Sequence, residues 1–280
     1  FPFDFIYDRA AALEWSMESV PLNNKMGKLM ATPLSRIINA DQQQNNRLPV
    51  LCINTTSMQD GRPGVVSTMK LDYNIFGRRL DVLDSLRPGE DVNLSSMVIL
   101  GARFPYVSPA GRIRNNYFVD GGYFDNSGAG VVHEMIIELQ RMISDSLQKD
   151  TAHYLRKLRF FVLHTTNSPL EEAVLKKVHP LINDLAAPVK TLVGSYTNQT
   201  YVNNLRLLKY LLQINKGDTT YIPFNLYQKG EKDLYPMNWV ISDSTLHKMN
   251  KRLDGYAKID RFIKAVNDYD SKHMLHLFRD

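Results

Sequence analysis

The chain has 280 residues, 44% of them hydrophobic and 22% charged, which is ordinary for a globular protein with a sizeable core. Its formal net charge of +5 comes from scattered Lys and Arg, without a polybasic run. This pattern disfavours nucleic-acid binding and leaves contact with an anionic lipid surface open. The single cysteine, Cys52, excludes an intramolecular disulfide and a thiolate metal cluster.

The first elements in chain order are a helix over residues 8–19, with Asp8 as its N-cap, and a pair of strands. Residues 48–54 form a continuous apolar run of the length of a buried strand. A second strand is predicted over residues 65–69, because the preceding segment is rich in Gly and Pro and indicates a turn. The two strands are predicted to form either a hairpin or an extended segment that projects from the sheet. The Gln- and Asn-rich stretch before them is expected to be an irregular connection.

A further helix is predicted to begin within residues 91–96, and Pro105 and Pro109 end it. Residues 118–128 follow and are the most informative stretch of the chain. Here a strand-like approach leads into a carboxylate and two glycines, and a helix with apolar residues at steps of three and four begins near Val131. The order is strand, tight turn, helix.

Asp120 is the carboxylate in this turn, and Gly121 and Gly122 follow it. The glycines permit a turn with positive φ and the close approach of a substrate or a second loop. A loop at the end of a strand is a common place for catalytic groups in α/β proteins, so Asp120 is a candidate base. The alternative is an ordinary turn in which Asp125 or Asn126 caps the following helix.

Four more elements follow: a strand over 159–165, a helix over 189–214, a strand over 220–226 and, from residue 244, an amphipathic helix capped by Ser242 or Asp243. Strands and helices alternate in this order, which is typical of a mainly parallel sheet covered by helices on both faces. We therefore predict an α/β fold. No repeat or low-complexity linker is present, so residues 1–280 are predicted to form a single domain.

Other chemical signatures are weak. His273 and His276 lie three residues apart near the end of the chain, but no acidic or Cys partner stands at ligand spacing, so no metal site is predicted. His164 is interpreted as a satisfied histidine at a strand end, with a catalytic histidine as the alternative. No Gly-x-Ser-x-Gly elbow, phosphate loop, dinucleotide fingerprint or metalloprotease helix occurs, and no cofactor is expected.

Several segments share one further pattern. They are Asn54-Thr55-Thr56 with Gly61-Arg62, residues 91–96, residues 102–111, the run from Asp120-Gly121-Gly122 to Asn126, and residues 235–242 before the last helix. Together they resemble the second half of a bacterial patatin-like phospholipase domain. The resemblance covers residues 1 to 255, and the block from 91 to 128 is the most specific part of it.

The resemblance implies an α/β acyl hydrolase that cleaves phospholipids, lysophospholipids or related esters with a Ser-Asp dyad and no histidine. It assigns the role of catalytic base to Asp120, with Gly121, Gly122 and Asn126 as support of the catalytic loop. A carboxylate is a better base for a serine hydroxyl when burial raises its pKa, and the apolar residues before Asp120 would supply that burial. Peripheral membrane contact is expected from the substrate class alone, and the compartment stays open.

The chain departs from the family pattern, because it lacks the nucleophile motif and the glycine-rich oxyanion loop that precede the aspartate there. It also opens on an aromatic cluster at Phe1 without a methionine, so we expect a processed or trimmed polypeptide whose serine lies on a missing N-terminal segment. Two alternatives are a catalytically inactive patatin-fold binding or scaffold module, and an unfamiliar dyad with a serine inside this chain. Arg103 and Arg112 flank the loop in the sequence. One interpretation is that they attract a lipid phosphate, and the alternative is that they are ordinary surface residues.

Overall fold

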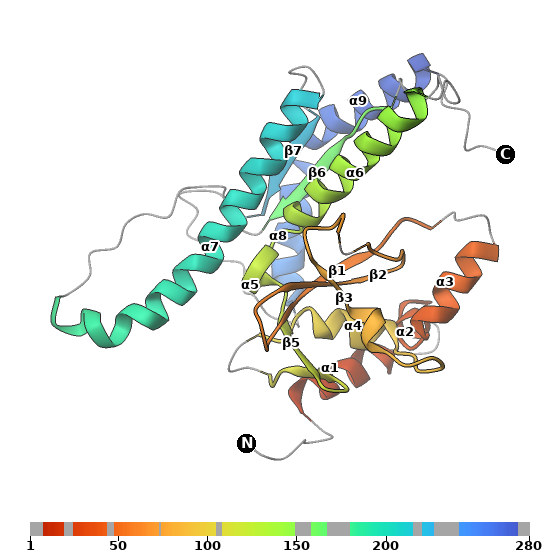
Figure 1. Cartoon of the computed structure of the whole chain (residues 1–280). Coiled ribbons are helices and arrows are strands. Elements are labelled where there is room, and N and C mark those ends of the chain that lie inside the picture. The colour runs from red at the N-terminus through yellow and green to blue at the C-terminus, as the bar shows by residue number, and fades with distance from the viewer. Residues whose placement is uncertain are drawn as a thin grey trace. The chain divides into compact units, whose positions relative to one another are not determined.

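The structure is a computed structural model, and it describes residues 8–19, 25–43, 48–72, 74–104, 108–148, 158–166, 180–214, 220–226 and 241–273. Helices and strands are mixed along the chain (Figure 1), so the α/β class is confirmed. Residues 1–134 and 179–200 form one compact unit, and residues 135–178 and 201–280 form a second. Each unit is described by itself, and the single domain over residues 1–280 stays a prediction.

Five short strands form the sheet of the first unit: β1 (Cys52–Ser57), β2 (Pro63–Ser67), β3 (Leu80–Asp81), β4 (Gly111–Ile113) and β5 (Asn116–Asp120). They lie in the order β3-β2-β1-β5-β4. β1 is antiparallel to both of its neighbours, and β4 is antiparallel to β5. Only β2 and β3 pair in parallel in this sheet. The prediction of a mainly parallel sheet is therefore wrong.

Short connections explain the antiparallel pairing. Residues 58–62 join β1 to β2, and only Arg114 and Asn115 join β4 to β5. A parallel pair needs a crossover of about a dozen residues or more, whereas hairpins of this length return the chain beside itself in the opposite direction. The alternation of strands and helices misled the prediction because it combined strands that belong to two different sheets.

The first predicted strand is displaced along the chain. Leu48 and Val50 are about half exposed, and β1 begins only at Cys52. Its fully buried end is Thr55–Ser57, which pairs with β5 on one side while the strand pairs with β2 on the other. Neighbouring strands, rather than the apolar run, thus decide which residues are buried. The predicted hairpin between β1 and β2 is confirmed.

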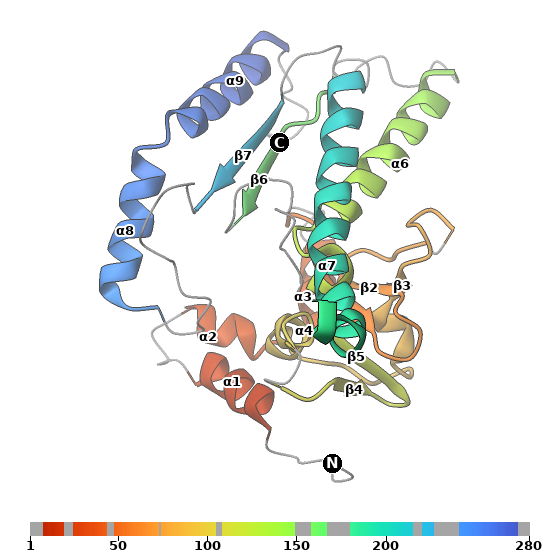
Figure 2. The same cartoon turned by 90° about the vertical axis from the view of Figure 1, so that its left-hand side faces the viewer.

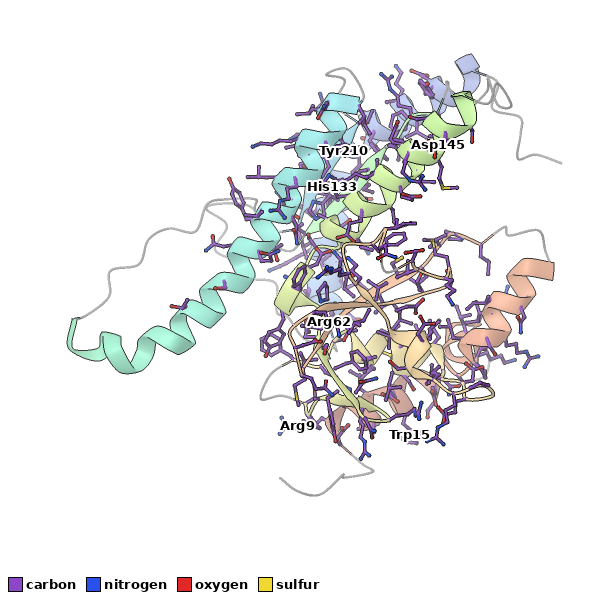
Figure 3. The ribbon with its side chains drawn as sticks, viewed as in Figure 1. Arg9, Trp15, Arg62, His133, Asp145 and Tyr210 are labelled. Atoms are coloured by element: carbon purple, nitrogen blue, oxygen red, sulfur yellow. The ribbon has the colours of Figure 1, made fainter. Side chains whose placement is uncertain are left out.

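The helical elements of the first unit are α1 (Arg9–Glu18), α2 (Lys25–Met30), α3 (Leu34–Gln43), the 3-10 helix η1 (Val82–Ser85), α4 (Leu94–Leu100) and α5 (Gly122–Asp125). α4 packs on β1 and β5, and α1 and α2 pack on α4 (Figure 2). Asp8 caps α1, accepting a hydrogen bond from the Ala11 N–H at 2.7 Å, as predicted. Trp15 of α1 is largely exposed (Figure 3).

α3 ends within the Gln- and Asn-rich stretch, residues 41–47, that we expected to be irregular: residues 41–43 are helical, and residues 44–47 lie outside the described ranges. Its Leu34 is 2% exposed and belongs to the core of the first unit, against which Ile37 and Ile38 also pack. These apolar residues stand at steps of three and four, so one face of the helix is buried although most of its sequence is polar. The same core contains Met97 of α4 and Phe118 of β5.

The second unit holds a separate sheet of two strands, β6 (Val162–Thr166) and β7 (Tyr221–Asn225), which are parallel. Both strands were predicted. α8 (Asp243–Asp254) and α9 (Ala257–His273) follow, and α9 lies beside β7 (Figure 2). Gly255 separates the two helices where the sequence predicted one, and Ser242 caps α8 as expected, accepting from the Thr245 N–H at 3.2 Å.

Two long helices contribute residues to both units. α6 (Ala129–Gln148) begins in the first unit and ends in the second, and α7 (Pro180–Ile214) does the same. The helix predicted over residues 189–214 is thus confirmed and extends further toward the N-terminus. No helix in the described ranges has both the length and the apolar content needed to cross a membrane.

Candidate functional site

Asp120 is the last residue of β5, and Gly121 joins it to the short helix α5. α6 begins at Ala129, only a few residues later. The predicted order of strand, tight turn and helix is therefore confirmed. The turn is tied to the segment after α4: the Asp120 N–H donates to the Arg103 carbonyl at 3.0 Å, and the Gly121 N–H donates to the Gly101 carbonyl at 3.1 Å.

The Asp120 side chain is half-buried and has one hydrogen bond. Its Oδ1 accepts from the Gly122 N–H at 2.6 Å, and no side chain of a described residue donates to the carboxylate. Burial raises the pKa of Asp120 above its ordinary value, and the Gly122 N–H opposes this rise. Oδ2 is left to bond a group from elsewhere. Such a carboxylate is suited to accept a proton from a substrate or a nucleophile.

Gly121 is required by space rather than by backbone conformation. Its φ of −65° and ψ of −22° are ordinary right-handed values, so the turn does not use the positive φ that glycine permits. A Cβ at this position would lie 2.4 Å from the Asn54 carbonyl oxygen, which belongs to the backbone of β1. The close approach of β1 to the turn therefore excludes any side chain here.

Gly122 is crowded by the side chains on either side of it. A Cβ there would lie 2.7 Å from Asn126 Oδ1 and 2.8 Å from Asp120 Oδ1. Asn126 follows the last residue of α5, is exposed, and places its amide beside Gly122. Of the three predicted support residues, Gly122 bonds to the Asp120 carboxylate directly, Asn126 lies on the other side of Gly122, and Gly121 packs against β1.

Two side chains of the loop, and not Asp120, accept hydrogen bonds from the first turn of α6. Ser127 Oγ accepts from the Ala129 N–H at 3.3 Å, and Asp125 Oδ2 accepts from the Val131 N–H at 3.1 Å. Both N–H groups lie in the first turn of α6, where backbone donors have no partner within the helix. Asp125 therefore satisfies a backbone donor at the start of α6, in line with the alternative in which it caps this helix. Asp120 takes no part in the contact.

A buried ion network that the sequence did not predict lies next to the turn. The Arg79 side chain is 1% exposed, its Nη2 lies 3.3 Å from Asp125 Oδ2, and its Nε donates to Glu134 Oε2 at 2.6 Å. The Arg79 guanidinium also stands 5.9 Å from the centre of the Phe124 ring. The network joins the loop before β3 to α5 and α6, residues far apart in the sequence, so no local pattern could have revealed it.

Asn54 of β1 links the sheet to the same turn. Its Nδ2 donates to the Asp125 carbonyl at 3.0 Å, which fixes the end of α5. Its Oδ1 is buried and has no hydrogen-bond partner among the described residues. Asn54 carries one of the segments of the family resemblance, but its contact with the Asp120 loop could not be read from the sequence, because the two lie on separate strands.

The two flanking arginines are occupied. Arg103 is 12% exposed at its side chain and forms ion pairs with Asp8 at 3.1 Å and Glu14 at 3.6 Å, which join the segment after α4 to α1. Arg112 donates from Nε to the Arg114 carbonyl at 2.7 Å, and its guanidinium lies near the Tyr117 ring. These contacts favour structural placements over an arginine free to bind a lipid phosphate.

No histidine side chain of a described residue bonds to Asp120. His164 is buried in the middle of β6, not at a strand end as predicted, and its Nδ1 forms a hydrogen bond with the Tyr221 hydroxyl across the β6–β7 pair. Burial raises the pKa of Tyr221 to about 12. The His273 side chain and His276 lie outside the described residues. Within the described ranges, no three His, Cys, Asp or Glu side chains gather as metal ligands would.

Comparison of the chain with protein-family models, with curated proteins and with solved structures found no match. The resemblance to patatin-like phospholipases therefore stays a prediction from short segments of the sequence. The arguments below depend on the geometry of the Asp120 turn and of its neighbours.

Proposed function

We propose that this chain is part of a patatin-like lipid acyl hydrolase, in which Asp120 is the base of a Ser-Asp dyad. The observation that carries the proposal is the state of the Asp120 carboxylate, which is half-buried, has a raised pKa and accepts a single hydrogen bond from its own loop. The segments of sequence around it supply the choice of reaction, because they resemble the part of that family that carries the aspartate.

The proposed chemistry uses Asp120 twice. In the first step its carboxylate takes the proton of a serine hydroxyl as the serine oxygen attacks the ester carbonyl, and the proton then passes to the departing alkoxide. In the second step Asp120 takes a proton from the water that attacks the acyl-enzyme carbonyl; the serine ester bond breaks, the fatty acid leaves, and the proton passes from Asp120 to the serine oxygen. In this proposal the serine and the oxyanion donors are supplied from outside residues 1–280, and the substrate is a phospholipid, a lysophospholipid or a related ester.

The test is a longer form of the protein that includes a preceding Gly-x-Ser-x-Gly segment, assayed with lysophosphatidylcholine. Asp120→Asn should lower the rate of hydrolysis by about 10⁴-fold or more, because the serine loses its base. Asp145→Asn is the matched control, since Asp145 lies exposed on α6 and pairs only with a surface arginine (Figure 3). Equal turnover of the Asp120→Asn and Asp145→Asn proteins would refute the dyad.

A binding or scaffold module is the second candidate, favoured by one observation. The chain contains no Gly-x-Ser-x-Gly, and no hydroxyl of a described side chain bonds to Asp120. A coding sequence without that motif upstream of Phe1 would support this candidate and exclude the dyad. Labelling of the 280-residue chain by a fluorophosphonate probe would instead indicate a reactive serine within it.

A further inference from the structure

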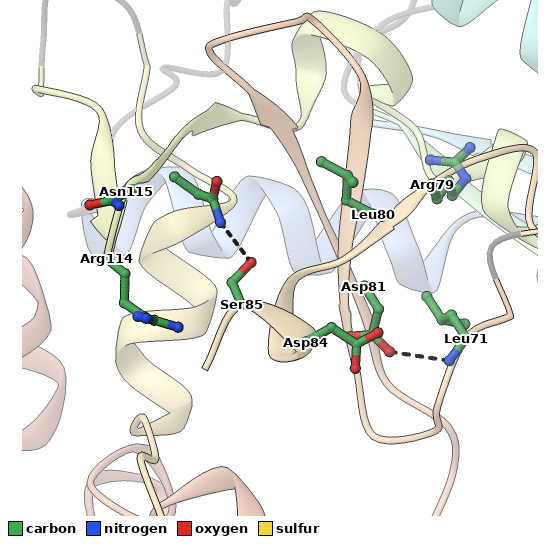
Figure 4. Close-up of a pocket in the computed structure, with 9 residues that line it drawn as sticks. Leu71, Arg79, Leu80, Asp81, Asp84, Ser85, Arg114 and Asn115 are labelled. Atoms are coloured by element: carbon green, nitrogen blue, oxygen red, sulfur yellow. Dashed lines mark hydrogen bonds between the residues drawn. The ribbon is translucent and has the colours of Figure 1, made fainter. Parts of the chain in front are cut away.

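A cavity of about 430 Å³ lies in the first unit, separate from the Asp120 turn (Figure 4). It is lined by residues of three segments: Leu71, then Arg79, Leu80, Asp81, Asp84 and Ser85, and the tip of the β4–β5 hairpin from Arg114 to Asn116. Its volume falls within the range of small-molecule sites, but its lining is mostly polar where such sites are mostly apolar. It therefore suits a small charged ligand better than an acyl chain.

Arg114 forms one side of this cavity and carries an unbalanced charge. It is exposed, and no carboxylate of a described residue lies within ion-pair distance of its guanidinium. Figure 4 shows its side chain extending toward the side of the cavity where Asp81 and Asp84 lie. The guanidinium of Arg114 thus faces the cavity and is not paired with a carboxylate of the described residues.

The backbone of Arg114 is in a conformation that arginine rarely adopts. Its φ is +57°, in the left-handed region, at the first position of a two-residue hairpin. Glycine, asparagine and aspartate are the usual residues at such positions. The tip is held by Gln59, whose Nε2 donates to the Asn115 carbonyl at 2.7 Å and whose Oε1 accepts from the Tyr117 N–H at 3.1 Å. Strain that a structure maintains in this way is common at binding sites.

The opposite side of the cavity is acidic. Asp84 is 65% exposed at its side chain, and its nearest cation is Lys70 at 3.8 Å, which is a weak surface contact. Asp81 is half-buried and accepts from the Leu71 and Leu83 N–H groups, at 3.2 Å and 3.1 Å. Between the two sides stands Ser85, whose Oγ accepts from Asn116 Nδ2 at 3.1 Å. The Ser85 hydroxyl proton is then free to donate to a ligand.

We propose that this cavity binds a small zwitterion, with its anionic oxygen group at Arg114 and its ammonium group at Asp84 and Asp81. A guanidinium bonds well to phosphate or carboxylate oxygens, and carboxylates bond to an ammonium group. A ligand with only one of these charges would leave one side of the cavity unmatched. This site is independent of the proposed Ser-Asp dyad, because neither Asp120 nor its loop contributes to it.

The experiment is calorimetric titration of the 280-residue chain with O-phosphoethanolamine. We expect saturable binding, and ethanolamine and inorganic phosphate, which each carry one of the two charges, should bind at least about tenfold more weakly. Vesicles of phosphatidylethanolamine in phosphatidylcholine distinguish the source of the ligand. Binding to both probes assigns the headgroup of a membrane lipid, and binding to the free probe alone assigns a soluble zwitterion.

Arg114→Gly is the decisive variant, because glycine accepts a φ of +57° and the hairpin keeps its fold. It should weaken phosphoethanolamine binding by about tenfold or more, as expected for loss of a charged hydrogen bond. Arg78→Gly is a matched control: Arg78 is also exposed with a positive φ of 64°, but it does not line the cavity. Asp84→Asn should weaken phosphoethanolamine while leaving inorganic phosphate unchanged.

Four outcomes would overturn the proposal. One is the absence of binding to phosphoethanolamine at millimolar concentration, in solution and on vesicles. Another is equal binding by the wild-type and Arg114→Gly proteins, and the third is binding of inorganic phosphate as tight as that of the zwitterion. Loss of binding in Arg78→Gly to the same extent as in Arg114→Gly would show that net charge, and not the cavity, is responsible.

Discussion

Asp120 combines two properties that oppose each other in the folded chain. Burial raises its pKa, so keeping it ionised at neutral pH costs stability. The only donor that its loop offers in return is the Gly122 N–H. A carboxylate held in this way lowers the stability of the folded chain but accepts a proton readily. Active sites often show this trade-off between stability and activity.

Asp120→Asn should therefore stabilise the chain at neutral pH. The folded pKa lies above the ordinary 3.8, so the folded chain holds the proton to a higher pH than the unfolded chain does. The stability that this group contributes is present below the unfolded pKa and is lost as pH rises through the folded pKa. Asparagine removes this loss and can still accept from the Gly122 N–H.

Thermal melts at pH 7 and pH 4 measure the effect. The variant should melt at a higher temperature than wild type at pH 7, and the difference should shrink at pH 4. Asp145→Asn, at an exposed site, should show no such dependence beyond the small effect of a surface ion pair. A lower melting temperature for Asp120→Asn at pH 7 would show that the carboxylate is stabilised in place, contrary to the expected desolvation.

At the scale of the elements, Arg79 connects the loop before β3 to helices that lie more than 40 residues further along the chain. It bonds to Asp125 of α5 and to Glu134 of α6, and a Cβ on Gly130 would lie 2.7 Å from its Nη2. α5 in turn begins directly after the Asp120 turn. This short helix beside the candidate base is thus tied to α6 by a buried cation.

Arg79→Met should destabilise the chain by about 3–5 kcal/mol, because it leaves two carboxylates without their buried cation. Arg62→Met is the control, since Arg62 pairs with Asp60 at 2.6 Å on the surface, where such a pair contributes about 1 kcal/mol or less. Urea denaturation followed by circular dichroism compares the two midpoints. Similar midpoints for the two variants would mean that the Arg79 network is no stronger than a surface pair.

Element types were easier to predict than their partners. The helix capped by Asp8, the hairpin at residues 58–62 and the strand-turn-helix around Asp120 follow from caps, turn residues and apolar spacing, which act over a few residues. The direction of the strands did not follow, because it depends on which strand lies beside which. β1 was displaced for the same reason, since its pairing with β5 buries Thr55–Ser57.

At the scale of the whole molecule, two helices contribute residues to both compact units. Two of the boundaries between the units fall inside helices, within α6 after Glu134 and within α7 after Thr200. Unfolding of one unit would therefore remove part of a helix from the other. A helix that loses its packed half is marginal by itself, because helical stability comes mainly from tertiary packing.

We therefore expect the chain to unfold in one cooperative transition, consistent with the predicted single domain. Differential scanning calorimetry should give a single peak whose calorimetric and van't Hoff enthalpies agree. Arg79→Met, which acts within the first unit, should shift the whole peak to lower temperature. A calorimetric scan of Arg79→Met with two peaks, of which only one lies at a lower temperature than in wild type, would show that the units unfold independently.

The sequence by itself determined the α/β composition, most helices, the β1–β2 hairpin and the position of Asp120 at the end of a strand. These features depend on interactions between residues a few positions apart. The tertiary structure alone decided the antiparallel order of the first sheet, the need for glycine at 121 against the Asn54 carbonyl, the Arg79 network and the cavity at Arg114. Each of these brings together atoms from distant segments, and no local pattern encodes such a meeting.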